Sequence, residues 1–265
     1  MSSTAFYSLE TPVEAAGGSV SYLRRVLDLV DLVAAVPPEG LTLSQLAEGS
    51  GMPVSTALRL ARLLEERGLA SRRPDKRFVP GPALVTLGLR ALRLLPTEHY
   101  RAAIADLGRS TGESVSVGVL IGDEIVLVAR HESAHPLRVV ATIGDVIAPH
   151  LSAMGKAILS AVSEQRRYEI IRRALGPSAI TVADALSEEL ERAAFEGFAR
   201  DEEVFAVGLR CIAAPVLGPG GEAHGAMSIA GPSTRFTRDI ADSCVPDLLT
   251  GARRVSHASS PQGEA

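Results

Sequence analysis

The chain has 265 residues, of which 46% are hydrophobic and 22% are charged, and its formal net charge is −4. This composition supplies apolar side chains for two hydrophobic cores and excludes a wholly disordered protein. Its two cysteines suggest neither a disulfide framework nor a cysteine-rich metal site. The first residues lack the segments of a signal peptide, and no apolar run approaches the roughly 18 residues of a membrane helix. We therefore expect a cytoplasmic protein without a membrane anchor.

The charges are distributed unevenly along the chain. Residues 1–95 hold 11 basic and 9 acidic side chains, whereas residues 96–265 hold 16 basic and 22 acidic ones. The densest basic stretch, 59–77, has seven basic and three acidic residues. A positive island on an acidic protein suits contact with phosphates, although a solvated charged face accounts for most charge runs.

The first hundred residues predict helices that are punctuated by turn residues. Residues 1–18 show no periodicity and are expected to be flexible. Ser19 is placed to cap a first helix that ends at the Pro37–Gly40 breaker, and Thr42 is placed to cap a second, shorter one. A tight turn and Pro53 then introduce a third helix, and Gly68 suits its C-terminal end. The predicted ranges of the second and third helices are 43–48 and 54–66.

Two short strands and a further helix are predicted next. The strands cover 69–71 and 77–79, with a turn at Pro74-Asp75. The helix covers 83–94 and ends before Pro96. This order predicts a winged helix-turn-helix over residues 19–81 and a linker over 82–96. The linker helix is apolar on much of its surface and could pack between subunits or on its own domain.

The third helix has one apolar and one polar face. Five apolar residues are expected to pack on the first two helices: Val54, Ala57, Leu58, Ala61 and Leu64. The opposite face offers a hydroxyl and two guanidinium groups, which can reach base edges and phosphates. An ordinary solvated helix and a protein-binding winged helix are the alternatives. The residues expected to contact double-stranded DNA, including those of the hairpin, are Ser55, Thr56, Arg59, Arg62, Arg72, Arg73, Lys76 and Arg77.

Helices and strands alternate irregularly after Pro96, which predicts an α+β domain over 97–255 with a mainly antiparallel sheet. The predicted helices are 98–110, 152–161, 164–175, 187–199 and 237–255. The predicted strands are 114–121, 124–131, 137–142, 212–217 and 224–230. Residues 256–265 are expected to form a flexible tail.

Three stretches of this domain carry chemistry. In the first, from Pro149 to Leu159, Ser152 can cap a helix whose first residues are small, and such a helix start favours anions. The second holds Asp201-Glu202-Glu203 and then Gly208 to Pro215, and the third is a strand around Ser228. Each also has a structural explanation: Cys211 as a small buried apolar residue, Asp201 in a solvated loop, and Lys156 and His150 as packing groups.

An enzyme is the alternative interpretation of the second domain. Cys211, His150 and Asp201 could act as nucleophile, base and orienting group in a hydrolase-like enzyme fused to a winged helix. No nucleophile elbow flanks Cys211, and no glycine-rich phosphate loop follows a strand. His131, His135 and His150 lack the paired spacing of metal ligands. We therefore expect no catalytic residue, no metal and no cofactor.

These motifs, in this order behind a winged helix, resemble the IclR family of bacterial transcriptional regulators from about Val20 to Val255. The resemblance implies a GAF-like effector-binding domain, a homodimer through the winged helices, and often a dimer of dimers. It also implies a small metabolite as effector, commonly a carboxylate, and a repressor is expected. Where some members have a second hydroxyl, this chain has Ala230. The implied ligand-binding residues are Ala153, Met154, Asp201, Leu209, Cys211, Ser228 and Ala230.

The residue types at this pocket suggest a class of effector. A carboxylate would lie at the helix start near Ser152, where the backbone N–H groups point outward. Asp201 would accept a hydrogen bond from a hydroxyl or an amine, and it would repel a bare anion. The chain has no Trp and few aromatic residues, which argues against stacking on a large aromatic effector. We expect a small hydroxy acid or amino acid.

Overall fold

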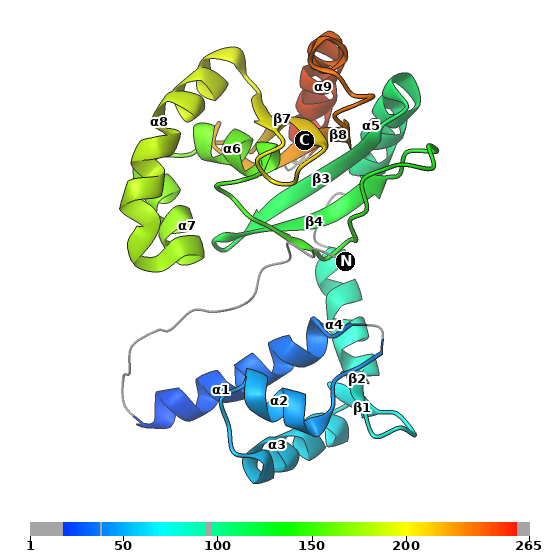
Figure 1. The fold of residues 1–265 in the computed structure, drawn as a ribbon, viewed down its shortest axis with the longest axis vertical. Helices are drawn as coiled ribbons and strands as arrows, with labels where there is room; N and C mark the ends of the chain where they lie inside the picture. Colours follow the sequence, from blue (N-terminus) through cyan, green and yellow to red (C-terminus); the bar gives the residue numbers. More distant parts are fainter. Residues whose placement is uncertain (1–17, 38, 94–96, 259–265) are drawn as a thin grey trace, which may run out of the picture. The chain divides into compact units, whose positions relative to one another are not determined.

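The computed structural model describes residues 18–37, 39–93 and 97–258. These residues divide into two compact units, one with residues up to 93 and one from residue 97 onward (Figure 1). Of the predicted flexible start, only Gly18 is described, and it lies in the first helix. Ser19 is therefore inside the helix and not at its cap. Residues 256–258 of the predicted tail are helical, and the rest of the tail lies outside the described residues.

The N-terminal unit has the predicted order of elements: α1 (Gly18–Ala34), α2 (Leu43–Gly49), α3 (Val54–Glu66), β1 (Ala70–Arg72), β2 (Phe78–Pro80) and α4 (Pro82–Leu92). Thr42 caps α2 as predicted, and its backbone N–H donates in return to the Gln45 side chain. Gly68 follows α3 with a φ of 68°, which glycine adopts without strain. The three helices and the hairpin enclose one apolar core that includes Leu29, Leu46, Leu60 and Phe78.

The C-terminal unit is built on one six-stranded sheet in the order β5-β4-β3-β8-β7-β6, with every pair antiparallel. Its strands are β3 (Ser114–Ile121), β4 (Glu124–His131), β5 (Val146–Ile147), β6 (Ala199–Glu202), β7 (Leu209–Leu217) and β8 (Ala223–Pro232). Its helices are α5 (Thr97–Thr111), α6 (Ala153–Ser160), α7 (Glu164–Leu175), α8 (Ala179–Glu196) and α9 (Arg238–Ala258). The α+β class with an antiparallel sheet is confirmed.

The helices of this unit cover both faces of the sheet. Helices α5 and α9 contact each other and pack on strands β3, β4, β7 and β8 (Figure 1). Helix α6 packs on β7 and β8 from the opposite face, with α7 and α8 beyond it. Glycines identify the two faces, because a Cβ on Gly118 would meet Met154 of α6 and a Cβ on Gly251 of α9 would meet Met227. Residues at two-residue steps from Gly118 therefore face α6.

Two predictions for this unit are wrong. Residues 137–142 are not a strand; Leu137 and Val140 are exposed, and the Val139 carbonyl accepts a hydrogen bond from the Arg130 side chain instead of from a neighbouring strand. The strand that pairs with β4 on the side away from β3 is β5. Helix α8 begins at Ala179, not at residue 187, and ends at Glu196; the next residue, Gly197, has a φ of 79°. The chain then turns into edge strand β6, so residues 199–202 are not helical or looped.

Candidate DNA-binding surface and effector site

Helix α3 separates its polar and apolar faces largely as predicted. Ser55, Arg59 and Arg62 are exposed and Thr56 is half-buried. Its buried residues are Ala57, Leu60, Ala61 and Leu64. Leu60 was not predicted to be buried, and Val54, which was, is 51% exposed because it lies in the first turn, before the packed stripe begins. The helix thus presents a hydroxyl and two guanidinium groups to solvent.

The hairpin beside α3 places its four cations in two different environments. Arg73 and Lys76 are exposed at the tip, where Lys76 adopts a φ of 65° and closes the turn by donating its N–H to the Arg73 carbonyl. Arg77 Nη1 donates to the Gly40 carbonyl at 2.9 Å, and the Arg72 guanidinium lies 5.5 Å from the centre of the Phe78 ring. The Arg77 guanidinium therefore helps to hold the hairpin on its own unit, whereas Arg72 is exposed and lies against its cross-strand partner inside the hairpin.

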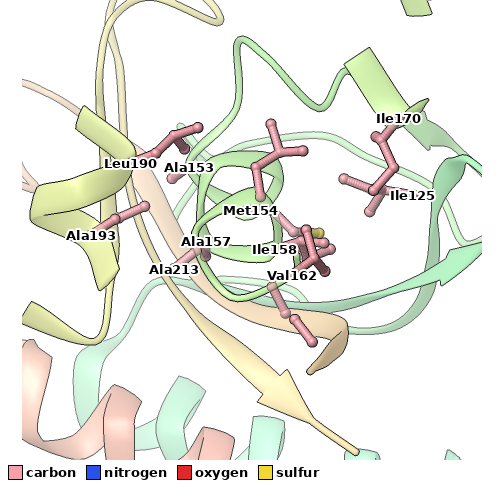
Figure 2. Packing of buried hydrophobic residues seen from close by; sticks show 14 of the residues in the cluster. Ile125, Ala153, Met154, Ala157, Ile158, Val162, Ile170, Leu190, Ala193 and Ala213 are labelled. Carbon is pink, nitrogen blue, oxygen red and sulfur yellow. The ribbon is translucent and has the colours of Figure 1, made fainter. Parts of the chain in front are cut away.

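In the second unit, the start of α6 is fixed against the sheet. Ser152 caps the helix as predicted, and its Oγ accepts the Gly155 N–H at 3.0 Å. Gly155 has no room for a side chain, because a Cβ would lie 2.1 Å from the Pro149 carbonyl oxygen. Ala153 and Met154 form the first turn and are buried in the cluster that Figure 2 shows around α6. The first turn of α6 is therefore tightly packed, with its side chains in the core and Gly155 against Pro149.

The sheet register brings the predicted ligand-binding residues of three strands together. Asp201 of β6 is directly opposite Cys211 of β7, and Cys211 is opposite Ala230 of β8. Ser228 lies two residues from Ala230 on the same face, as Leu209 does from Cys211. The seven residues proposed for ligand binding therefore belong to one face of the sheet and to the helix start that packs on it.

Asp201 is buried and already has hydrogen-bond donors. The residue is 1% exposed. Its Oδ1 accepts hydrogen bonds from the N–H groups of Val204 and Phe205, at 2.9 and 3.2 Å. Burial raises the pKa of Asp201, and the two backbone N–H groups only partly oppose that effect. Asp201 is thus a buried hydrogen-bonding group at the sheet edge and not part of a solvated loop.

The other polar groups do not form a catalytic arrangement. Burial, followed by the charge of Asp201, raises the pKa of the Cys211 thiol, so the nucleophilic thiolate is disfavoured. Burial and the charge of Lys156 lower the pKa of His150. Lys156 forms an ion pair with Glu189 of α8, with 2.7 Å between Nζ and Oε2. No group of His, Cys, Asp and Glu with metal-site geometry occurs within the described ranges.

A hollow of about 200 Å³ opens at the edge of the sheet, between β6 and α8. Its lining includes Lys156, Glu189, Arg200 and Glu202, and none of the seven predicted ligand-binding residues. Lys156 and Glu189 form an ion pair with each other, and Glu202 pairs with Arg210 and Arg238. Arg200 pairs with Asp242. The hollow is therefore distinct from the predicted pocket, and its charges are largely compensated.

Two polar residues on the α6 face of the sheet were not predicted to take part. Ser116 of β3 is 6% exposed and lies opposite Ser228 of β8 and Arg130 of β4. The pairing of β3 with β4 skips Val128, since Val117 faces Ala129 and Gly118 faces Leu127. This bulge brings Arg130 to the same face as Leu127. Simple alternation along the sequence would place those two side chains on opposite faces.

Comparison with known proteins identifies both units. The model of the IclR helix-turn-helix domain matches residues 23–74, and the model of the bacterial transcriptional regulator IclR C-terminal domain matches residues 97–257. The chain belongs to the IclR family. It is accordingly a DNA-binding transcriptional regulator with an effector-binding domain, and not an enzyme. No helix among the described residues is long and apolar enough to cross a bilayer.

Individual members of the IclR family resemble the chain over most of its length. The HTH-type transcriptional regulator BhcR of Paracoccus denitrificans is 30% identical over 254 residues, which cover 94% of this chain and 90% of that protein. The transcriptional repressor IclR of Escherichia coli is 29% identical, with coverages of 92% and 91%. An IclR homolog of Microbacterium hydrocarbonoxydans, solved in complex with 4-hydroxybenzoate, has the same fold with a TM-score of 0.73 and 22% identity, covering 89% and 98%.

Proposed function

We propose that this IclR-family regulator is a cytoplasmic repressor that reads its operator with α3 in the major groove. The observation that supports this most directly is the exposed polar face of α3, with Ser55, Arg59 and Arg62 on the side opposite the core. Arg59 and Arg62 would donate to base edges, and Arg73 and Lys76 would contact phosphates beside the groove. Thr56 would assist at the helix start and exposed Arg72 would also contact phosphates, while Arg77 would mainly hold the hairpin in position.

The DNA-binding form would be a homodimer or a dimer of dimers. Among the described residues of α4 none is buried, and Val85, Leu87 and Leu89 are 55 to 60% exposed. On α1, Leu23 and Leu27 are 60% and 56% exposed. Apolar side chains in this number are what a subunit interface would cover, and a two-fold operator requires a two-fold protein. Light scattering at micromolar concentration should exceed the 27.8 kDa of one chain; a species of that mass alone would contradict the dimer.

The effector would be a small carboxylate that also carries a hydroxyl or an amine, bound in a GAF-like pocket between the α6 start and the sheet. The support is the row of Asp201, Cys211 and Ala230, with Ser228 beside it, on the sheet face that packs against α6. The ligand named for the Microbacterium homolog, 4-hydroxybenzoate, carries both a carboxylate and a hydroxyl. No cofactor is needed. The effector would act because its affinity differs between the DNA-competent and DNA-incompetent forms.

Two measurements test this function. A gel shift with the upstream region of the protein's own gene should show a specific complex, and Arg59→Ala with Arg62→Ala should abolish its sequence preference. Thermal-shift measurements with lactate, 3-hydroxybutyrate, alanine and 4-hydroxybenzoate should raise the melting temperature for at least one of them. Stabilisation by toluene and by none of these acids would contradict the proposed effector class.

A further inference from the structure

We infer that Arg130, with the hydroxyls of Ser116 and Ser228, is the group that recognises the carboxylate of the effector. This inference rests on the proposed function and specifies its ligand-binding chemistry. The residues that the family resemblance implies contain no cation, and Ala230 removes one hydroxyl from that set. The sequence predicts the carboxylate at the α6 start near Ser152, where only backbone N–H groups would bind it. A positive charge that pairs with it would have to come from elsewhere on the same face, and the carboxylate would then lie there instead.

Arg130 is positioned to supply that charge. The bulge at Val128 places it opposite Ser116 on the α6 face, and its Nη1 donates to Ser116 Oγ at 3.2 Å. Ser116 is in turn opposite Ser228, so the guanidinium and two hydroxyls follow one another across three adjacent strands. Ser116 and Ser228 are 6% and 7% exposed, which shields this row from bulk water. A row of donors in such a setting binds an anion more strongly than it would in solvent.

The guanidinium is also incompletely paired. Its Nε is buried and has no hydrogen-bond partner within the described residues, and no carboxylate there forms an ion pair with it. Glu132 and Asp145 are the acids whose charges raise the pKa of Arg130, and both have other partners. Glu132 pairs with Arg138 at 3.4 Å, and Asp145 accepts the Thr142 N–H at 2.6 Å. Burial is the largest influence on Arg130 and lowers its pKa. Arg130 is half-buried, and a guanidinium that is partly removed from water without an anion is unfavourable, so a ligand carboxylate would relieve that penalty.

The opposite side of the same face holds the acidic group of the predicted pocket. Cys211 lies directly opposite Asp201 and Ala230 lies opposite Cys211, so these two residues separate Asp201 from the strands that carry Ser116 and Arg130. Cys211 and Ala230 are small, so a ligand lying over them would meet a cation on one side and a hydrogen-bond acceptor on the other. This polarity selects a small acid with a hydroxyl or an amine at its far end, with the carboxylate toward Arg130.

Arg130 also has a structural role, which an experiment must separate from its role in binding the carboxylate. Its Nη2 donates to the Val139 carbonyl and so anchors the segment 137–142, which contains no strand. Loss of that contact would affect every ligand alike. Loss of the guanidinium that pairs with the ligand carboxylate would weaken the binding of acids only. The affinity for an acid is therefore compared with the affinity for its own amide.

The experiment measures binding to the full-length protein by titration calorimetry at constant pH and ionic strength. The probes are lactate, 3-hydroxybutyrate and alanine, each paired with its amide. Arg130→Met should raise the Kd for an acid roughly 10- to 100-fold and leave the Kd for the amide unchanged. Arg130→Lys keeps the charge but not the planar fork, so its Kd for the acid should fall in between. Arg101→Met, which removes an exposed arginine of α5 that pairs with Glu98, is the matched control and should match the wild type.

Each possible result has a distinct meaning. Equal binding of an acid by the wild type and Arg130→Met overturns the assignment of Arg130 and leaves the proposed function intact. Binding of no acid by the wild type overturns the effector class itself. Should Arg130→Met fail to fold, as judged by circular dichroism, Arg130→Lys and Ser116→Ala decide the question. If both of those folded variants bind acids as the wild type does, the inference is wrong.

Discussion

Arg59 and Lys76 offer the sharpest test of how the N-terminal unit binds DNA, because substitutions at the two positions should weaken DNA binding in different ways. Arg59 is exposed on α3, so removing its side chain should leave the fold intact. If its guanidinium forks onto a guanine, Arg59→Ala should lose about 1–3 kcal/mol of specific binding, or roughly 5- to 150-fold in affinity. Affinity for unrelated DNA should change much less.

Lys76 is the matched comparison at the hairpin tip. Lys76→Gln keeps a side chain of similar size and should weaken binding to all sequences alike, and the slope of log K against log salt should fall by about one unit. The assay is fluorescence anisotropy with the operator and a scrambled duplex at several salt concentrations. Unchanged operator affinity in Arg59→Ala, or an equal loss on both duplexes, would refute the placement of α3 in the groove.

Three further predictions concern the structure that supports these sites. Arg77→Met removes the hydrogen bond to the Gly40 carbonyl and should destabilise the hairpin by about 1 kcal/mol; exchange of the Leu41 and Phe78 amides should be roughly 5-fold faster, with Arg73→Met as an unchanged control. Gly155→Ala brings a Cβ within 2.1 Å of the Pro149 oxygen and should lower the free energy of unfolding by about 1–3 kcal/mol, whereas Gly220→Ala, with open space around it, should not. Burial raises the pKa of Asp201, so the folded state resists its ionisation, and the wild type should lose stability relative to Asp201→Asn as the pH rises from the usual aspartate pKa through the raised one. Urea denaturation over that range checks the last prediction, with exposed Asp184→Asn as the control; a pH-independent difference would contradict it.

The N-terminal unit could be predicted from sequence because its determinants are local. Thr42 with Gln45 caps α2, Gly68 ends α3, and the apolar positions of α3 repeat at helical spacing. What the sequence did not show there is which cations are free. Arg77 lies next to Lys76 in the sequence, yet its partner, the Gly40 carbonyl, is 37 residues away. Only the tertiary structure distinguishes a guanidinium that holds the hairpin from a lysine that is open to phosphate.

The C-terminal unit was harder to predict because pairing between distant strands decides it. The alternating residues 137–142 resemble a strand, but the place beside β4 is taken by β5, and Val139 interacts with a side chain instead. The helix preceding β6 was misplaced because Ala179 and its neighbours carry no strong start signal. The motif residues Ser152 and Asp201 could be identified, whereas the hydrogen bonds from Val204 and Phe205 to Asp201 could not.

The bulge at Val128 shows why the position of Arg130 on the α6 face of the sheet could not be inferred from the sequence. In a regular strand, Leu127 and Arg130 point to opposite faces, and the arginine would be assigned to the side covered by α5 and α9. One extra residue in β4 reverses that assignment for everything after it, so Arg130 joins Ser116 and Ser228 while Leu127 stays in the core with Ile125. A single skipped pairing thus turns a sheet face lined with hydroxyls and a carboxyl group into one that also carries a positive charge. The selectivity of the regulator for acids would therefore depend on strand register as much as on the identity of the residues in its motifs.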